Sequence, residues 1–165
     1  MLKRIVFLLI PAAVAAALLC GCSPPFPKEL IDQVDRGLGF ADLIRNPDRF
    51  RGKIVMLGGT IVERKNLKEG TRVEVLQRPL DGEGRPEWTD ETGGRFLVDV
   101  PQFLDAAVYQ PGRAVTIIGS VEGAKRQPLG EIEYQYPVLT AKQVHLWSPT
   151  TGPRFSIGVG VYRGF

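Results

Sequence analysis

Two stretches of the sequence, Gly52-Lys-Ile-Val-Met-Leu-Gly-Gly-Thr-Ile61 and Gly112-Arg-Ala-Val-Thr-Ile-Ile-Gly-Ser-Val121, follow the same pattern. In each, a glycine comes seven residues after the opening glycine, and a hydroxyl residue and an aliphatic residue follow it. Both stretches are rich in strand-forming residues, and a glycine inside a strand typically marks a bulge or a sharp bend. Two long strands that bend at the same place suit a small barrel, in which strands must curl to serve both sides.

Alternation of apolar and polar residues predicts further strands around this pair. In one of them, for example, Val98 and Val100 share a face with Phe96. The predicted strands are Ile54–Glu63, Thr71–Gln77, Arg95–Val100, Ala114–Glu122, Glu131–Leu139 and a short final segment, Ala141–Trp147. Five strands interrupted between the third and the fourth match the outline of the OB fold. We therefore predict an all-β protein, a small OB-like barrel of five to six strands, with a β-sandwich as the alternative.

Three segments between these strands lack the alternation. Phe40–Asn46 has apolar residues at helical spacing and is followed by a proline, which predicts a short helix. Pro101–Tyr109 breaks the strand pattern and predicts a short helical insertion. Ala124–Gly130 predicts a turn.

The N-terminus has the features of a secretory signal peptide. Lys3 and Arg4 precede an apolar run, Ile5 to Leu19, which is shorter than the about 20 residues of a membrane span. The following Leu19-Cys20-Gly21-Cys22 resembles the lipobox of bacterial lipoproteins. That resemblance implies cleavage before Cys22, diacylglycerol on its sulfur and acylation of its amine. An ordinary signal peptide that contains cysteines is the alternative.

Lipidation at Cys22 has two consequences. Each buried methylene contributes about 0.8 kcal/mol, so three acyl chains anchor a protein in effect irreversibly. Ser23 follows the anchor instead of aspartate, which by resemblance to the sorting rules of two-membrane bacteria implies the outer membrane, where we expect the domain on the periplasmic face. Cys20 leaves with the signal peptide, so the mature chain has no free thiol, disulfide or thiolate metal site.

Removal of the signal peptide also lowers the net positive charge of the chain. The whole chain has 21 Lys and Arg against 18 Asp and Glu, and loss of Lys3 and Arg4 leaves 19 against 18. This balance gives no reason to expect a nucleic-acid partner. The predicted divisions of the chain are the signal peptide, 1–21; a lipidated N-terminus and proline-rich tether, 22–38; the barrel domain, 39–148; and a C-terminal tail, 149–165.

The sequence contains no recognisable set of catalytic, metal or cofactor ligands. The single histidine, His145, stands beside Trp147 and is more typical of a packing or surface residue than of a general base. Glu131 and Glu133 would lie about 6–7 Å apart along a strand, a spacing that can serve glycoside hydrolysis. A solvated outer strand face explains the two glutamates better, so we predict no enzyme activity, no metal and no cofactor.

The polar sides of the second and third predicted strands form a candidate groove. In an OB-like barrel this face binds ligands between the first and the last hairpin loops. Its residues are Arg72, Glu74, Arg95 and Asp99, and its borders are Lys65–Gly70 and Ala124–Gly130. Mixed charge and the lack of aromatic residues argue against single-stranded nucleic acid. A groove for an oligosaccharide or a peptide fits this face.

The tail contains Phe155–Phe165, in which apolar residues alternate with small ones. It is either a floppy or docked tail, or a strand that adds to the sheet edge of a partner or touches the membrane.

Several motifs together resemble the Slp family of outer-membrane lipoproteins. They are Arg78-Pro-Leu-Asp81, Gly84-Arg-Pro86, Gly94-Arg-Phe-Leu-Val-Asp99, Phe103-Leu-Asp105, Gly112-Arg-Ala-Val-Thr-Ile-Ile-Gly119, Gly130-Glu-Ile-Glu-Tyr-Gln-Tyr-Pro-Val138 and Trp147. The resemblance implies a starvation- or stress-induced lipoprotein and supplies no catalytic residues. We expect a non-enzymatic lipoprotein that contributes to envelope integrity or stress adaptation. The alternatives are an OB-like module that binds a cell-wall glycan or an envelope peptide, and an envelope hydrolase that uses Glu131 or Glu133.

Overall fold

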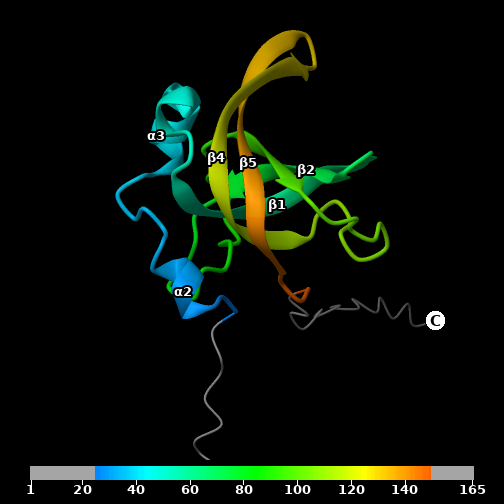
Figure 1. The fold of residues 1–165 in the computed structure, drawn as a ribbon. Coiled ribbons are helices and arrows are strands. Elements are labelled where there is room, and N and C mark those ends of the chain that lie inside the picture. The colour runs from blue at the N-terminus through cyan, green and yellow to red at the C-terminus, as the bar shows by residue number, and fades with distance from the viewer. Residues whose placement is uncertain (1–24, 150–165) are drawn as a thin grey trace, which may run out of the picture.

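Five strands of the chain close into a barrel (Figure 1). The computed structural model describes residues 25–149. Its strands are β1 (Ile54–Leu67), β2 (Gly70–Arg78), β3 (Arg95–Val100), β4 (Ala114–Leu129) and β5 (Ile132–Leu146). They are hydrogen-bonded in the order β1-β2-β3-β5-β4, and β4 returns to β1. Only the β3–β5 pair is parallel. The all-β, OB-like barrel is confirmed, and the β-sandwich alternative is wrong.

The alternating residues of the strands fill the barrel. Val98 and Val100 are buried beside Phe96, as their spacing predicts. The other fully buried side chains of this core are Leu43, Val55, Ile61, Val73, Val75, Val115, Ile117, Val121 and Leu139. Burial of each side chain of this size contributes about 1.5–3 kcal/mol, so the core accounts for most of the driving force for closure.

Short helices precede the barrel. They are α2 (Lys28–Ile31), α3 (Phe40–Arg45) and the 3-10 helix η1 (Pro47–Phe50). The helix predicted over Phe40–Asn46 is confirmed, and its Phe40 ring packs 5.9 Å from that of Phe96. No helix within residues 25–149 combines the length and the apolar character needed to span a bilayer.

The helical insertion predicted over Pro101–Tyr109 is wrong. This segment makes turns, in which the Tyr109 N–H donates to the Asp105 carbonyl and the Ala107 N–H donates to the Asp105 side chain. Phe103 is 65% exposed and Val108 is 45% exposed. With these apolar side chains in solvent, the segment has no buried stripe to stabilise a longer helix.

The turn predicted at Ala124–Gly130 is also wrong, because β4 continues to Leu129 and the chain turns at Gly130 and Glu131. The two segments predicted after it form one strand, β5. Pro128 is tolerated in β4 because β1 pairs only as far as Ser120, which leaves this part of β4 at a sheet edge. Residues 122–137 therefore form a hairpin, here named the arm, that projects beyond the barrel at the top of Figure 1.

The paired glycines of β1 allow the β2 backbone to approach β1 closely, and they do not form the predicted bulge. Gly58 and Gly59 keep their register with both neighbouring strands. A Cβ atom at Gly59 would overlap the backbone carbonyl of Leu76. The bulge of β1 comes later, at the residue between Ile61 and Glu63. In β4, by contrast, the register shifts beside Gly119, as predicted.

The described part of the tether packs on the barrel. Phe26 is 2% exposed, and the Pro25 carbonyl accepts a hydrogen bond of 3.2 Å from the Gln143 side chain. The His145 ring lies between those of Phe26 and Trp147, with centroids 5.7 and 4.5 Å away. Partial burial lowers the pKa of His145 from its ordinary value of 6.5. The signal peptide and residues 150–165 of the predicted tail lie outside the described residues.

We expect Gly59→Ala to lower the free energy of unfolding by about 1–3 kcal/mol or more, because the new methyl group meets backbone atoms that cannot rotate away. Denaturant titration measures the loss. Gly82→Ala is the matched control, since nothing lies within 4 Å of its new Cβ atom, and it should change stability by less than about 0.5 kcal/mol. Equal effects of the two substitutions would contradict the close approach.

We expect His145 to make the fold less stable as the pH falls. Its folded pKa is depressed, so the unfolded chain takes up the proton first and stability is lost as the pH drops below 6.5 toward the folded pKa. His145→Phe keeps a ring between Phe26 and Trp147 and removes the titration. Unfolding curves at pH 8 to 5 should show a smaller loss for the variant, and identical pH profiles would contradict this role.

Candidate binding groove

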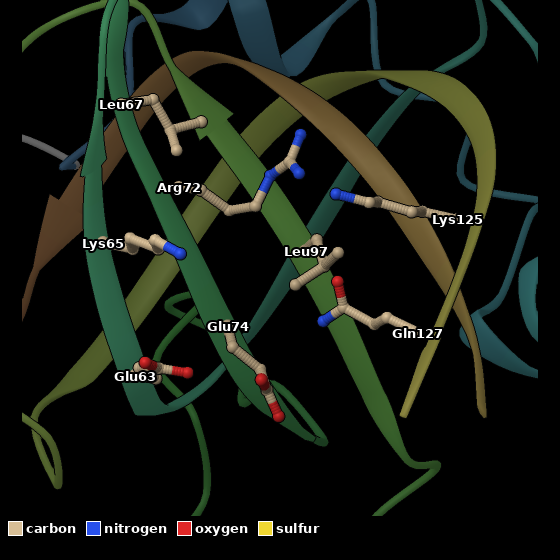
Figure 2. A pocket seen from close by; sticks show the side chains of 8 residues that line it. All are labelled: Glu63, Lys65, Leu67, Arg72, Glu74, Leu97, Lys125 and Gln127. Atoms are coloured by element: carbon tan, nitrogen blue, oxygen red, sulfur yellow. The ribbon is translucent and has the colours of Figure 1, made fainter. Parts of the chain in front are cut away.

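A groove lies on the outside of the barrel, between the β1–β2 hairpin and the arm. Strands β1, β2 and β3 supply six of its eight lining residues, and β4 supplies the other two on the opposite wall. The lining residues are Glu63, Lys65, Leu67, Arg72, Glu74, Leu97, Lys125 and Gln127 (Figure 2). The volume of this open groove is about 220 Å³, which is below the roughly 300–1,000 Å³ of pockets for drug-sized ligands. The groove therefore suits a small group or the end of a chain.

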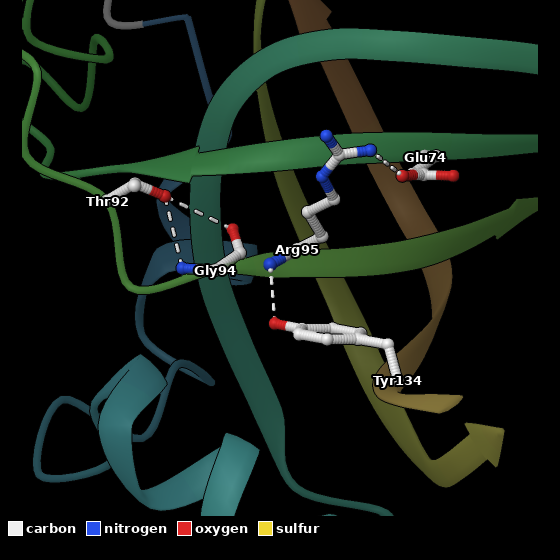
Figure 3. A network of polar contacts seen from close by, with 5 residues as sticks. All are labelled: Glu74, Thr92, Gly94, Arg95 and Tyr134. Carbon is white, nitrogen blue, oxygen red and sulfur yellow. Dashed lines mark hydrogen bonds and ion pairs between the residues drawn. The ribbon is translucent and has the colours of Figure 1, made fainter. Parts of the chain in front are cut away.

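The structure brings the four predicted groove residues together as two ion pairs. The Nε and Nη2 atoms of Arg72 donate to the two carboxylate oxygens of Asp99, both at 2.6 Å. Arg95 Nη1 donates to Glu74 Oε1, also at 2.6 Å (Figure 3). Two-pronged pairing of this kind fixes the guanidinium plane, and the hydrogen bonds to Asp99 raise the pKa of Arg72. Arg72 and Glu74 line the groove, whereas Arg95 and Asp99 support them.

The β1 bulge brings two further charged residues to the groove. Ile61 faces the core and is 2% exposed. Alternation alone would send Glu63 and Lys65 to the same inner face, but the extra residue after Ile61 reverses the faces. Both side chains therefore project outward beside β2. The sequence prediction of the groove did not include Glu63 and placed Lys65 only in a segment that borders the groove, because it put the bulge at the glycines.

The register of β1 and β2 separates the charges of the groove. Lys65 stands directly opposite Arg72, and Glu63 stands directly opposite Glu74. Directly opposed like charges destabilise a sheet. Asp99 and Arg95 offset the charges on β2, but within residues 25–149 no ion pair involves Glu63, Lys65 or the Lys125 side chain of the arm. One end of the groove is thus cationic and the other acidic (Figure 2).

Two tyrosines hold the arm against β3. Tyr136 is 1% exposed and packs with Leu97 and Val138, and the Tyr134 ring lies 4.7 Å from its own. Tyr134 Oη accepts a 3.0 Å hydrogen bond from the Arg95 backbone N–H (Figure 3). Burial is the main cause that raises the pKa of Tyr136. Because these contacts fix the arm, the wall that carries Lys125 and Gln127 is formed before any ligand binds.

Two sequence patterns are consistent with the packing of the arm on β3. Leu97 is an apolar residue on the otherwise polar face of its strand, between Arg95 and Asp99. The apolar face of β5, with Tyr134 and Tyr136, is its complement. Neither pattern by itself shows that the two faces meet, because no local pattern specifies that β3 pairs with β5.

The other candidate residues lie outside the groove. Glu131 belongs to the tip of the arm, Glu133 follows it on β5, and both are exposed. Neither lines the groove. Within the described residues, no group of three or more His, Cys, Asp or Glu side chains could hold a metal ion.

Two solved structures show a weak overall similarity to this chain. A mitochondrial single-stranded DNA-binding protein of Saccharomyces cerevisiae, Rim1, aligns with 58% of this chain and 94% of its own, at 14% identity and a TM-score of 0.35. A single-stranded DNA-binding protein of Streptomyces coelicolor aligns with the same coverage at 12% identity and a TM-score of 0.35.

Two of the sequence relatives are described as a lipoprotein and an outer membrane protein. The lipoprotein YeaY of Escherichia coli K12 is 31% identical over 112 residues, which cover 66% of this chain and 58% of YeaY. A protein of Haemophilus influenzae is 30% identical over 100 residues, 60% of this chain and 54% of its own. The chain thus spans little more than half of these two relatives.

The outer membrane protein Slp of Escherichia coli K12 is 26% identical over 132 residues, which cover 79% of this chain and 69% of Slp. The model of the outer membrane lipoprotein Slp family matches residues 19–158. This match includes the whole barrel, the arm and the segment around Cys22. The chain belongs to the Slp family of outer membrane lipoproteins.

Proposed function

We propose that the protein is a non-enzymatic binding module, anchored to the outer membrane through lipid on Cys22, that supports the envelope under stress. The polarised groove with its preformed walls is the observation that carries this proposal. Its ligand is a component of the envelope, a peptide or a cell-wall glycan. Family membership supports the location.

The start of the described chain and the arm lie toward opposite ends of the barrel (Figure 1). Cys22 precedes the first described residue, Pro25, by three residues, which span at most about 11 Å. Pro25 and Phe26 are held against β5, and α2 lies at the end of the barrel away from the arm (Figure 1). A short, docked tether of this kind would keep the barrel close to the bilayer and direct the arm away from it, into the periplasm.

Binding without catalysis fits the chemistry of the chain. The sole histidine packs between two aromatic rings. The two glutamates considered for hydrolysis are exposed at the end of the arm and do not line the groove. The groove, by contrast, combines charges held in ion pairs with charges that form no ion pair within residues 25–149.

We expect Cys22→Ser to abolish lipidation and release the protein from the outer membrane, because no acyl chain is then attached. Palmitate labelling and membrane fractionation measure the two effects. Cys20→Ser is the matched control and should stay labelled and membrane-bound, since the signal peptide is removed before Cys22. A labelled, membrane-bound Cys22→Ser protein would show that the anchor lies elsewhere.

We expect a strain without this gene to lose resistance to detergent or acid, and the wild-type gene to restore it. A Lys125→Glu gene should restore little, because the substitution reverses a charge of the groove wall. Lys142→Glu makes the same change at an exposed β5 position outside the groove and should restore growth fully. Normal growth of the deletion strain under every envelope stress would count against the proposal.

A further inference from the structure

We infer that the groove binds a short zwitterionic peptide, with the ligand carboxylate at Lys65, Arg72 and Lys125 and the ligand amine at Glu63 and Glu74. This inference rests on the proposed function, because it takes the groove to be the binding site. It goes further by naming the chemistry of the ligand and the direction in which it lies.

The cationic end of the groove is suited to a carboxylate. Lys65 and Lys125 extend from opposite walls toward the space beside Arg72 (Figure 2). Asp99 engages Nε and Nη2 of Arg72, which holds the guanidinium in place and leaves Nη1 outside that pair. A ligand carboxylate at this end would meet the Arg72 guanidinium, which Asp99 holds in place, and the ammonium groups of Lys65 and Lys125. Neither lysine is in an ion pair within residues 25–149.

The acidic end is suited to an amine. Glu74 is 9% exposed and shares one carboxylate oxygen with Arg95. Glu63, directly opposite, has no such partner in the described chain. An ammonium group between these two carboxylates would remove their repulsion.

The spacing of the two ends selects the ligand. Residues two apart on a strand are separated by roughly 6.5–7 Å, which is the offset between the Glu63 and Lys65 positions of β1. One extended residue spans at most about 3.6 Å, so the amine and the carboxylate of a dipeptide can reach both ends. The groove volume of about 220 Å³ agrees with a ligand of this size.

The same arrangement disfavours other ligands. A nucleic-acid phosphate would be repelled by the acidic end, which lies in the same groove. An uncharged glycan would leave both sets of like charges unrelieved. If Glu63 and Lys65 exchanged places, each would stand across from a β2 residue of opposite charge. The existing order is therefore less stabilising than the exchanged order would be. A ligand with both charges explains that order.

A titration of the full-length lipoprotein in non-ionic detergent micelles tests the inference. Alanylalanine with free termini should shift the NMR resonances of Lys65, Arg72 and Glu74. N-acetyl-alanylalanine and alanylalanine amide each lack one charge and should bind at least about tenfold more weakly. Absence of binding by the free dipeptide, or equal binding by either capped form, would overturn the inference.

A charge exchange provides the second test. The double variant Glu63→Lys/Lys65→Glu keeps the composition and net charge, but creates opposite-charge pairs with Arg72 and Glu74. Its melting temperature should rise by about 2–5 °C, while its affinity for the free dipeptide should fall at least about tenfold. A correctly folded variant that binds as tightly as the wild type would place the dipeptide elsewhere and overturn the assignment.

These outcomes are separable from failure of the proposed function. If Lys125→Glu fails to rescue the deletion strain and the free dipeptide does not bind, the groove remains functional but its ligand is not a zwitterionic peptide. If the dipeptide binds the groove and Lys125→Glu rescues fully, the ligand chemistry stands and the proposed envelope role fails.

Discussion

The whole structure depends on β1 being hydrogen-bonded along both edges at once. Gly58, Gly59 and Thr60 pair with β2 on one side and with β4 on the other, and this shared segment closes the barrel. The backbone of β2 approaches Gly59 too closely for a side chain. Beyond Thr60 the strand leaves β4 and continues along β2 alone, and the bulge after Ile61 lies at this point. Consecutive parts of one strand therefore close the core and place Glu63 at the groove.

Local patterns predicted the strands well where one face is buried and the other is solvated. Alternation identified Val73, Val75 and the apolar face of β3 correctly. It failed for the arm, because Gly123, Pro128 and Gly130 are typical of turns and nothing in the sequence shows which of them ends the strand. The answer depends on the β4–β5 ladder, which continues through the first two positions to the turn at Gly130.

For the candidate site too, local patterns predicted which residues share a strand face but not which strands pair. Alternation predicted that Arg72, Glu74, Arg95 and Asp99 share a face, and the structure places them together. Their pairing depends on the β2–β3 register, which the sequence does not specify. The remaining lining residues come from β1 beyond its bulge and from the arm. Both features are set by long-range pairing, so the sequence patterns assigned Lys65 and Lys125 only to the segments that border the groove and not to its lining.

The separation of roles among the charges distinguishes the groove from an ordinary polar surface. Asp99 and Arg95 are not lining residues, yet each fixes the charged group of a residue that is. Lys65 and Glu63, which form no ion pair within residues 25–149, add charge of the same sign as the β2 residues opposite them. A surface shaped by solubility alone would intersperse the signs. Here Arg72 and Glu74, held by their ion pairs, define a cationic and an acidic end. The side chains of Glu63, Lys65 and Lys125 can then contact a ligand that brings the opposite charge to each end.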